Sequence, residues 1–191
     1  MNRLSLRSLP NLISGARLVA GPVLVVLAMA HAETGFCWLL VAALISDIAD
    51  GLIARALALQ SQLGAMLDSA ADVTTLASAA YGIHVFHPAV LREHGIGCAL
   101  VLGGWALVCV IALLRYARLS SFHTYASKAA GYALGFFLVM LFVQGFSALL
   151  FYAAVALSVV GSAEELALLW YLPAWRADVR GLWWVLRERR K

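Results

Sequence analysis

The chain has 191 residues, of which 63% are hydrophobic, and its mean hydropathy is +0.89. Soluble domains hold about 45–50% apolar residues, so this composition excludes a soluble globular protein and indicates an integral membrane protein. The formal net charge is +4, but the basic residues lie at the edges of apolar segments, which excludes a nucleic-acid-binding surface as their explanation.

Six apolar segments are long enough to cross a bilayer, which takes about 20 helical residues. We expect these spans at residues 12–31, 36–57, 65–86, 97–116, 128–144 and 147–171. The predicted fold is all-α, a polytopic membrane protein with a single six-helix domain over residues 1–175. Residues 176–191 form a basic, aromatic tail that we expect to lie on the anionic membrane surface.

The positions of Lys and Arg predict the orientation, because cytoplasmic loops carry an excess of both. With six spans and a cytoplasmic N-terminus, thirteen of the 14 basic residues face the cytoplasm and only Arg92 faces outward. We therefore expect both termini in the cytoplasm, and a location in a bacterial inner membrane. The first segment also imitates a secretory signal peptide, but its removal would leave five spans and break this charge pattern.

Four aspartates interrupt the second and third segments, as Asp47-x2-Asp50 and Asp68-x3-Asp72. An ionised Asp at the centre of a spanning helix costs roughly 3 kcal/mol, so four of them indicate a function. Residues three or four apart share a helix face. A short polar turn at residues 60–62 makes the two segments an antiparallel hairpin, and we expect all four carboxylates to converge in its cytoplasmic half.

Four carboxylates in one pocket repel each other unless a cation neutralises them. Oxygen ligands alone favour a hard ion such as Mg²⁺, Mn²⁺ or Ca²⁺, and the absence of His and Cys from the group argues against zinc. A set of interhelical salt bridges is an alternative, but Arg55 is the only nearby base in the sequence. A cation transporter is another alternative, although it predicts acidic residues through the full membrane depth.

The whole pattern resembles the signature of the CDP-alcohol phosphatidyltransferase family. It reads Asp47-x2-Asp50-Gly51-x2-Ala54-Arg55-x8-Gly64-x3-Asp68-x3-Asp72 and matches every fixed position. The stretch Pro10-Asn11-x2-Ser14-x2-Arg17 is similar to the N-terminal element of many members. The resemblance implies metal-dependent transfer of a phosphatidyl group from a CDP-linked lipid, such as CDP-diacylglycerol, to an alcohol with release of CMP. It also implies a homodimer.

The resemblance further implies a role for each matching residue. The expected ligands of Mg²⁺ or Mn²⁺ are Asp47, Asp50, Asp68 and Asp72, and Asp72 is also the expected base that activates the acceptor hydroxyl. The residues expected to contact the CDP moiety are Asn11, Arg17, Gly51, Ala54, Arg55 and Gly64.

The acceptor alcohol is less well defined by the sequence. Arg115, Arg118 and Lys128 gather at the expected cytoplasmic ends of two spans. They fit a pocket for the phosphate of glycerol 3-phosphate or inositol phosphate, and they also fit simple anchoring. The position of Lys128 at the start of a helix favours the pocket over anchoring, because the helix dipole stabilises a cation least at the N-terminus. However, many glycerol-phosphate-using relatives carry Pro and Lys where this chain has Ser69 and Val73, which leaves serine open as the acceptor.

Two further features allow alternatives. His84, His87 and His94 lie in or near an expected outer loop, where they fit a metal site or, as we expect, the membrane interface. The pair Gly131-x3-Gly135 fits either a dimer seam or close packing within one chain.

Overall fold

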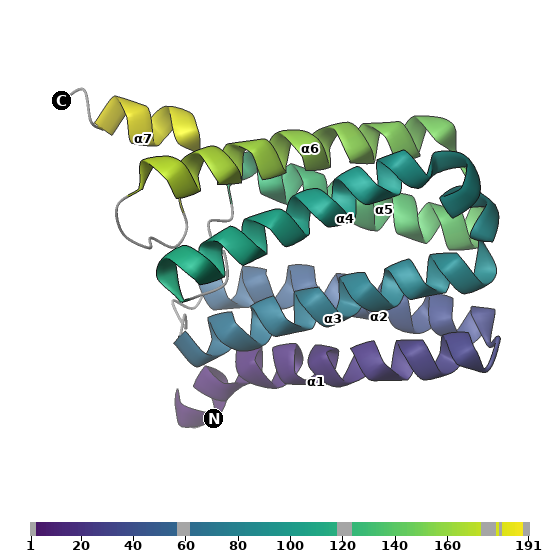
Figure 1. The fold of residues 1–191 in the computed structure, drawn as a ribbon. Coiled ribbons are helices and arrows are strands. Elements are labelled where there is room, and N and C mark those ends of the chain that lie inside the picture. The colour runs from purple at the N-terminus through teal and green to yellow at the C-terminus, as the bar shows by residue number, and fades with distance from the viewer. Residues whose placement is uncertain (1–2, 57–61, 118–123, 173–178, 180, 189–191) are drawn as a thin grey trace. The chain divides into compact units, whose positions relative to one another are not determined.

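The computed structural model describes residues 3–56, 62–117, 124–172, 179 and 181–188, without the side chains of residues 3–10, 50–56, 62, 63, 65 and 188. Every regular element in these ranges is an α-helix, which confirms the all-α prediction (Figure 1). The helices are α1 (Arg3–Met29), α2 (Glu33–Ala56), α3 (Gln62–Phe86), α4 (Pro88–Tyr116), α5 (Tyr125–Gln144), α6 (Ala148–Tyr171) and α7 (Leu182–Glu188).

The helices end close to the predicted positions, and some begin well before them. α4 begins at Pro88 rather than at residue 97, so the expected outer loop is reduced to His87. Proline suits the first position of a helix, where its missing N–H has no partner to lose. The backbone of α4 is non-helical at His94 (φ −123°, ψ 24°). The tight junction between α5 and α6 turns at Gly145, whose φ of +91° favours glycine.

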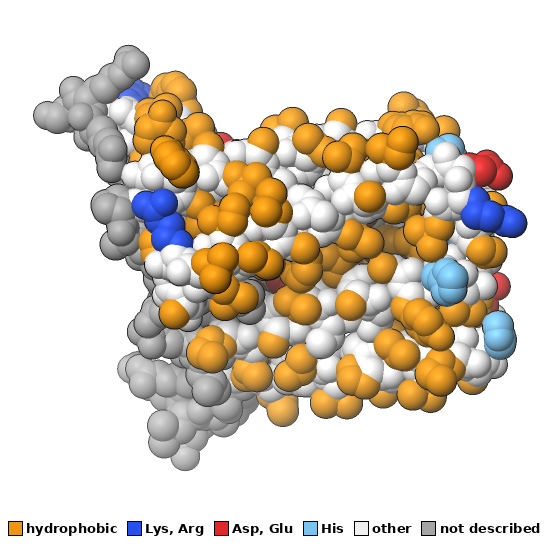
Figure 2. Space-filling view, viewed as in Figure 1, with side chains coloured by type: hydrophobic (Ala, Val, Ile, Leu, Met, Phe, Trp, Pro, Cys, Tyr) orange, Lys and Arg blue, Asp and Glu red, His pale blue; other side chains and the backbone are white. Residues whose placement is uncertain are grey.

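Four helices in the described part of the chain are long and apolar enough to cross a membrane. They are Asn11–Met29 within α1, and the whole of α4, α5 and α6. On the face seen in Figure 2, hydrophobic side chains are spread along the helices, and most charged and histidine side chains lie near the helix ends. A helix that is apolar on its outward face needs lipid rather than water around it. The polytopic class is therefore supported, while a count of six spans stays a prediction.

The chain forms two compact units, residues 1–91 and 92–191. In the first unit, α1 packs along both α2 and α3 (Figure 1). In the second unit, α5 packs along α6, and α7 packs against α6. The predicted tail therefore contains a short helix.

Each helix of the first unit presents one buried stripe to the other two. Along these stripes, residues recur at intervals of three or four, as expected for one face of a helix. The stripes comprise Ser14, Arg17, Gly21, Leu24 and Ala28 on α1, Phe36, Leu40 and Ala43 on α2, and Ala71, Thr75, Ser78 and Ala79 on α3. The stripe of α1 is polar at its N-terminal end, and apolar residues fill the rest of the core.

α1 and α3 approach each other closely at Gly21. A Cβ at this position would lie 2.8 Å from the Cβ of Thr74, and the Ser78 hydroxyl lies 2.9 Å from the Gly21 carbonyl oxygen. Small residues at a helix crossing allow such an approach of two backbones. Because Arg17 lies one turn before Gly21, this contact also sets how far Arg17 stands from α3.

We expect Gly21→Leu to destabilise the protein by about 1–3 kcal/mol, because the added side chain overpacks the crossing. The matched control is Gly15→Leu on the same helix, where a Cβ meets nothing within 4 Å. Thermal unfolding in detergent measures both variants. Equal melting temperatures for the two would contradict a close α1–α3 contact at Gly21.

Candidate metal centre

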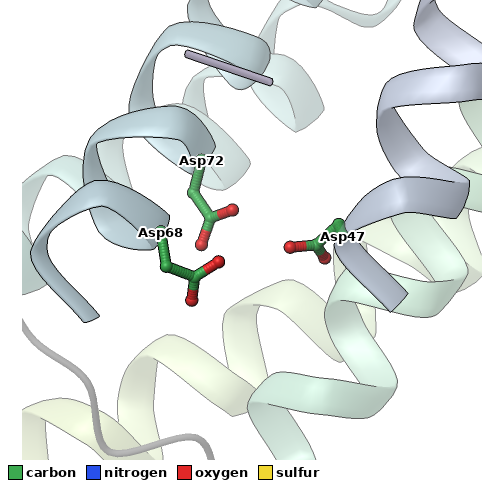
Figure 3. Close-up of side chains that lie close together, drawn as sticks. All are labelled: Asp47, Asp68 and Asp72. Atoms are coloured by element: carbon green, nitrogen blue, oxygen red, sulfur yellow. The ribbon is translucent and has the colours of Figure 1, made fainter. Parts of the chain in front are cut away.

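Three aspartates of the first unit point toward one another (Figure 3). Asp47 comes from α2, and Asp68 and Asp72 come from α3. One carboxylate oxygen from each lies within 4.8 Å of the others, and together they form a group that could hold a metal ion. The predicted convergence is therefore observed for three of the four aspartates; the side chain of Asp50 lies outside the described residues.

The helix stripes explain why these carboxylates meet. Asp47 follows Ala43 by four residues, so it extends the stripe of α2 beyond its apolar part. Asp68 and Asp72 precede Thr75 on the matching face of α3. Since α1 packs on both helices, the three carboxylates also face the polar end of the α1 stripe.

Arg17 of α1 binds all three carboxylates. Its side chain is only 1% exposed. One guanidinium nitrogen donates to Asp47 at 2.5 Å, and the other donates to Asp68 at 2.5 Å and to Asp72 at 3.4 Å. The prediction that Arg55 is the only nearby base was wrong. Arg17 was expected to contact the CDP moiety and was not assigned to the aspartates, because it comes from another helix, 30 residues before Asp47.

The donor set fits one hard divalent cation. Three carboxylates and one guanidinium carry a net charge of −2, and every candidate ligand atom is oxygen. The side chains of Asp47, Asp68 and Asp72 are 44%, 28% and 46% exposed, so the group is partly accessible to solvent. Mg²⁺ typically uses a few carboxylates and completes its shell with water or substrate phosphate.

The residues expected to contact CDP are only partly described. Asn11 lies on α1 and Gly64 on α3, and both are partly buried. Gly51, Ala54 and Arg55 belong to α2, but the structure describes only their backbone. Their contact with CDP stays a prediction.

The basic residues expected at the acceptor belong to the second unit. Arg115 donates to the carbonyl oxygen of Leu172 at 3.2 Å, and the hydroxyl of Tyr116 donates to the same oxygen at 2.7 Å. Both therefore satisfy the C-terminal end of α6. Lys128 is half-buried in the first turn of α5, and Arg118 lies outside the described residues.

The three histidines have separate partners. His87 Nε2 lies 3.5 Å from Glu33 Oε1, and His84 lies beside the ring of Tyr81. The ring of His94 stacks on Phe146 with centroids 4.5 Å apart. Within the described ranges, no group of potential metal ligands includes a histidine.

The family model of CDP-alcohol phosphatidyltransferase matches residues 7–160. The CDP-diacylglycerol--serine O-phosphatidyltransferases of Mycobacterium bovis and Mycobacterium tuberculosis are each 31% identical over 139 residues, which cover 71% of this chain and 45% of theirs. The chain therefore spans about half the length of these relatives. No solved structure matches it.

Proposed function

The chain belongs to the CDP-alcohol phosphatidyltransferase family, and from this premise we propose that it transfers a phosphatidyl group from a CDP-linked lipid to an alcohol and releases CMP. The observation that supports this most is the convergence of Asp47, Asp68 and Asp72 on Arg17. CDP-diacylglycerol is the proposed donor, because its lipid chains can stay in the bilayer while CMP leaves to water.

We propose that Asp47, Asp50 and Asp68 hold Mg²⁺ or Mn²⁺, together with Asp72. When bound, the cation supplies positive charge to the diphosphate and to the departing CMP. Asp72 accepts the proton of the acceptor hydroxyl as a general base, and its side chain is the most exposed of the three described. Arg17 holds the carboxylates together, because its planar fork donates in several directions at once.

The CDP moiety is proposed to lie against α1 and the α2–α3 hairpin. This proposal rests on residues that match the family signature or its N-terminal element: Asn11, Arg17, Gly51, Ala54, Arg55 and Gly64. Small residues at three of these positions leave space for a nucleotide.

Serine is the acceptor that we favour. The similar mycobacterial proteins are serine phosphatidyltransferases, and Ser69 and Val73 depart from the pattern of glycerol-phosphate users. Arg115 donates a hydrogen bond to the carbonyl oxygen of Leu172, which favours a structural role for Arg115. The expected glycerol 3-phosphate acceptor gains no support from the comparisons.

Lys128 is proposed to pair with the anionic group of the acceptor, which is a carboxylate in serine and a phosphate in the alternatives. Losing this charge-assisted bond in Lys128→Ala should cost about 2 kcal/mol, or roughly thirtyfold in acceptor kcat/KM. The KM for the CDP-lipid should change much less, and Lys128→Arg should keep most of the activity. An equal loss for both substrates would assign Lys128 to the diphosphate or the fold, and no loss would assign it to anchoring.

Six spans with both termini in the cytoplasm remain our proposed topology. α2 and α3 have 24 and 25 residues, which exceeds the roughly 20 needed to span. In cells, a membrane-impermeant thiol reagent should label a cysteine introduced at Glu93 and miss one introduced at Asp178. The reverse pattern would place the carboxylates near the outer surface, away from cytoplasmic CMP.

A homodimer is also proposed. Gly131 on α5 is exposed, and a Cβ there would meet nothing within 4 Å. This position therefore favours a seam with a second chain over packing within one chain. The particle mass in native nanodiscs tests it, and a single chain per particle would contradict the dimer.

Reconstitution into liposomes separates the enzyme from the cation transporter. The enzyme releases CMP from CDP-diacylglycerol when serine and a divalent cation are present, and it conducts no ions. Cation flux without CMP release would replace the proposed function with transport.

A further inference from the structure

α7 packs its apolar face into the core of the second unit. Val185 is buried and Leu182 is partly buried, against Leu168 and Leu169 near the end of α6. The backbone N–H of Leu182 donates to Glu164 Oε1 at 3.0 Å. α7 is therefore held on the end of α6 by apolar packing and by a hydrogen bond to a carboxylate.

The other face of α7 is exposed, aromatic and basic. Trp183 is 59% exposed, and Leu186 and Trp184 are also exposed. The guanidinium of Arg187 lies 5.2 Å from the centre of the Trp183 ring, since residues four apart share a helix face. In the sequence, residues 187–191 contain four basic residues and one acidic residue.

Other exposed aromatic residues lie at the same end of the second unit. Trp170 and Tyr171 are the last two residues of the candidate span α6, and Tyr125 is the first residue of the candidate span α5. The ring of Tyr125 lies 5.6 Å from that of Trp184 on α7. Aromatic residues at the ends of spans mark the level of the lipid headgroups, so this group places α7 at that level.

We infer that the exposed face of α7 binds the surface of an anionic bilayer. Trp183 and Leu186 enter the headgroup region, and Arg187 pairs with acidic headgroups. A bilayer around the candidate span α6 would lie within reach of α7, because α7 packs on the end of that helix. Lipid binding by α7 is independent of the proposed reaction.

The test places a nitroxide spin label on Leu186→Cys of the full chain in nanodiscs, with Cys37, Cys98 and Cys109 replaced by Ala. Collisions with oxygen and with a water-soluble nickel chelate report the depth of the label. We expect the label to lie in the headgroup region when the discs contain phosphatidylglycerol, and to become more water-exposed in pure phosphatidylcholine. Arg187→Glu should reduce this difference between the two lipids.

The matched control is a label on Trp170→Cys, which is 80% exposed and lies at the end of the candidate span α6. Because Trp170 lies at the headgroup level itself, its label should report the same headgroup depth in both kinds of disc, whatever the charge of the lipid. A water-exposed label at position 186 in both lipids would overturn the inference. Equal insertion of the label in both lipids would also overturn it. If protection of the label depended on the number of chains per disc, a second copy of the chain would cover α7, and the inference would again be wrong.

Amide hydrogen exchange of the unmodified protein gives a second measurement that needs no substitution. Residues 182–188 should exchange several-fold more slowly in discs with phosphatidylglycerol than in discs without it. Identical exchange in both lipids would overturn anionic lipid binding even if a cysteine variant fails to fold.

Discussion

Asp68→Asn is expected to lower CMP release by about 1,000-fold, which corresponds to about 4 kcal/mol of transition-state stabilisation. Asn keeps the shape and one oxygen of the side chain but removes its negative charge. That charge lies 2.5 Å from a guanidinium nitrogen of Arg17, and one oxygen of Asp68 lies within 4.8 Å of an oxygen of each of the other two carboxylates. Initial rates of CMP release at saturating Mg²⁺ measure the effect.

Glu33→Gln is the matched control for Asp68→Asn. Glu33 is also a carboxylate of the first unit, but it lies in the first turn of α2 beside His87, away from the aspartates. Its variant should keep activity within about twofold. Full activity of Asp68→Asn, or equal losses in both variants, would contradict a metal-binding role for Asp68.

Arg17→Leu is expected to destabilise the metal-free protein by about 2–3 kcal/mol. The substitution removes a buried cation and leaves three carboxylates facing one another, although their partial exposure lowers the cost below that of a fully buried pair. In thermal unfolding, the melting temperature should fall by roughly 5 °C or more.

Mg²⁺ should stabilise Arg17→Leu more than it stabilises the unmodified protein. Without the guanidinium, the three carboxylates attract a divalent cation more strongly, and binding to the folded state raises its stability. Arg17→Lys keeps the charge but loses the planar fork, so its melting temperature should lie between those of the other two. If Arg17→Leu and the unmodified protein had the same melting temperature in the absence of metal, this would contradict the central position of Arg17 among the carboxylates.

Much of the fold could be predicted from apolar segment length alone. The predicted ends at residues 86, 116, 144 and 171 coincide with the ends of α3, α4, α5 and α6. Helix starts were less predictable: residues 88–96 contain polar and charged side chains that resemble a loop, yet Pro88 opens a helix there. Backbone hydrogen bonds and helix-capping residues also decide where a helix begins, so hydropathy alone does not mark its first residue.

The aspartates of the site were predictable, because their spacing places them on one face of each helix. Arg17 was not assigned to them, although its signal is present in the sequence. Ser14, Arg17, Gly21, Leu24 and Ala28 follow the spacing of a buried helix face, which puts Arg17 inside the unit. The hydrogen bond from Arg115 to Leu172 joins residues 57 apart, and no local pattern predicts such a contact.

The most direct test of the proposed function follows radiolabelled serine into lipid while CMP is measured in the same reaction. The protein is reconstituted with CDP-diacylglycerol and assayed with Mg²⁺, with Mn²⁺ and with excess EDTA. We predict one labelled lipid for each CMP released with either metal, and no product in EDTA. Full activity in EDTA would contradict the metal centre, and CMP release without labelled lipid would contradict serine as the acceptor.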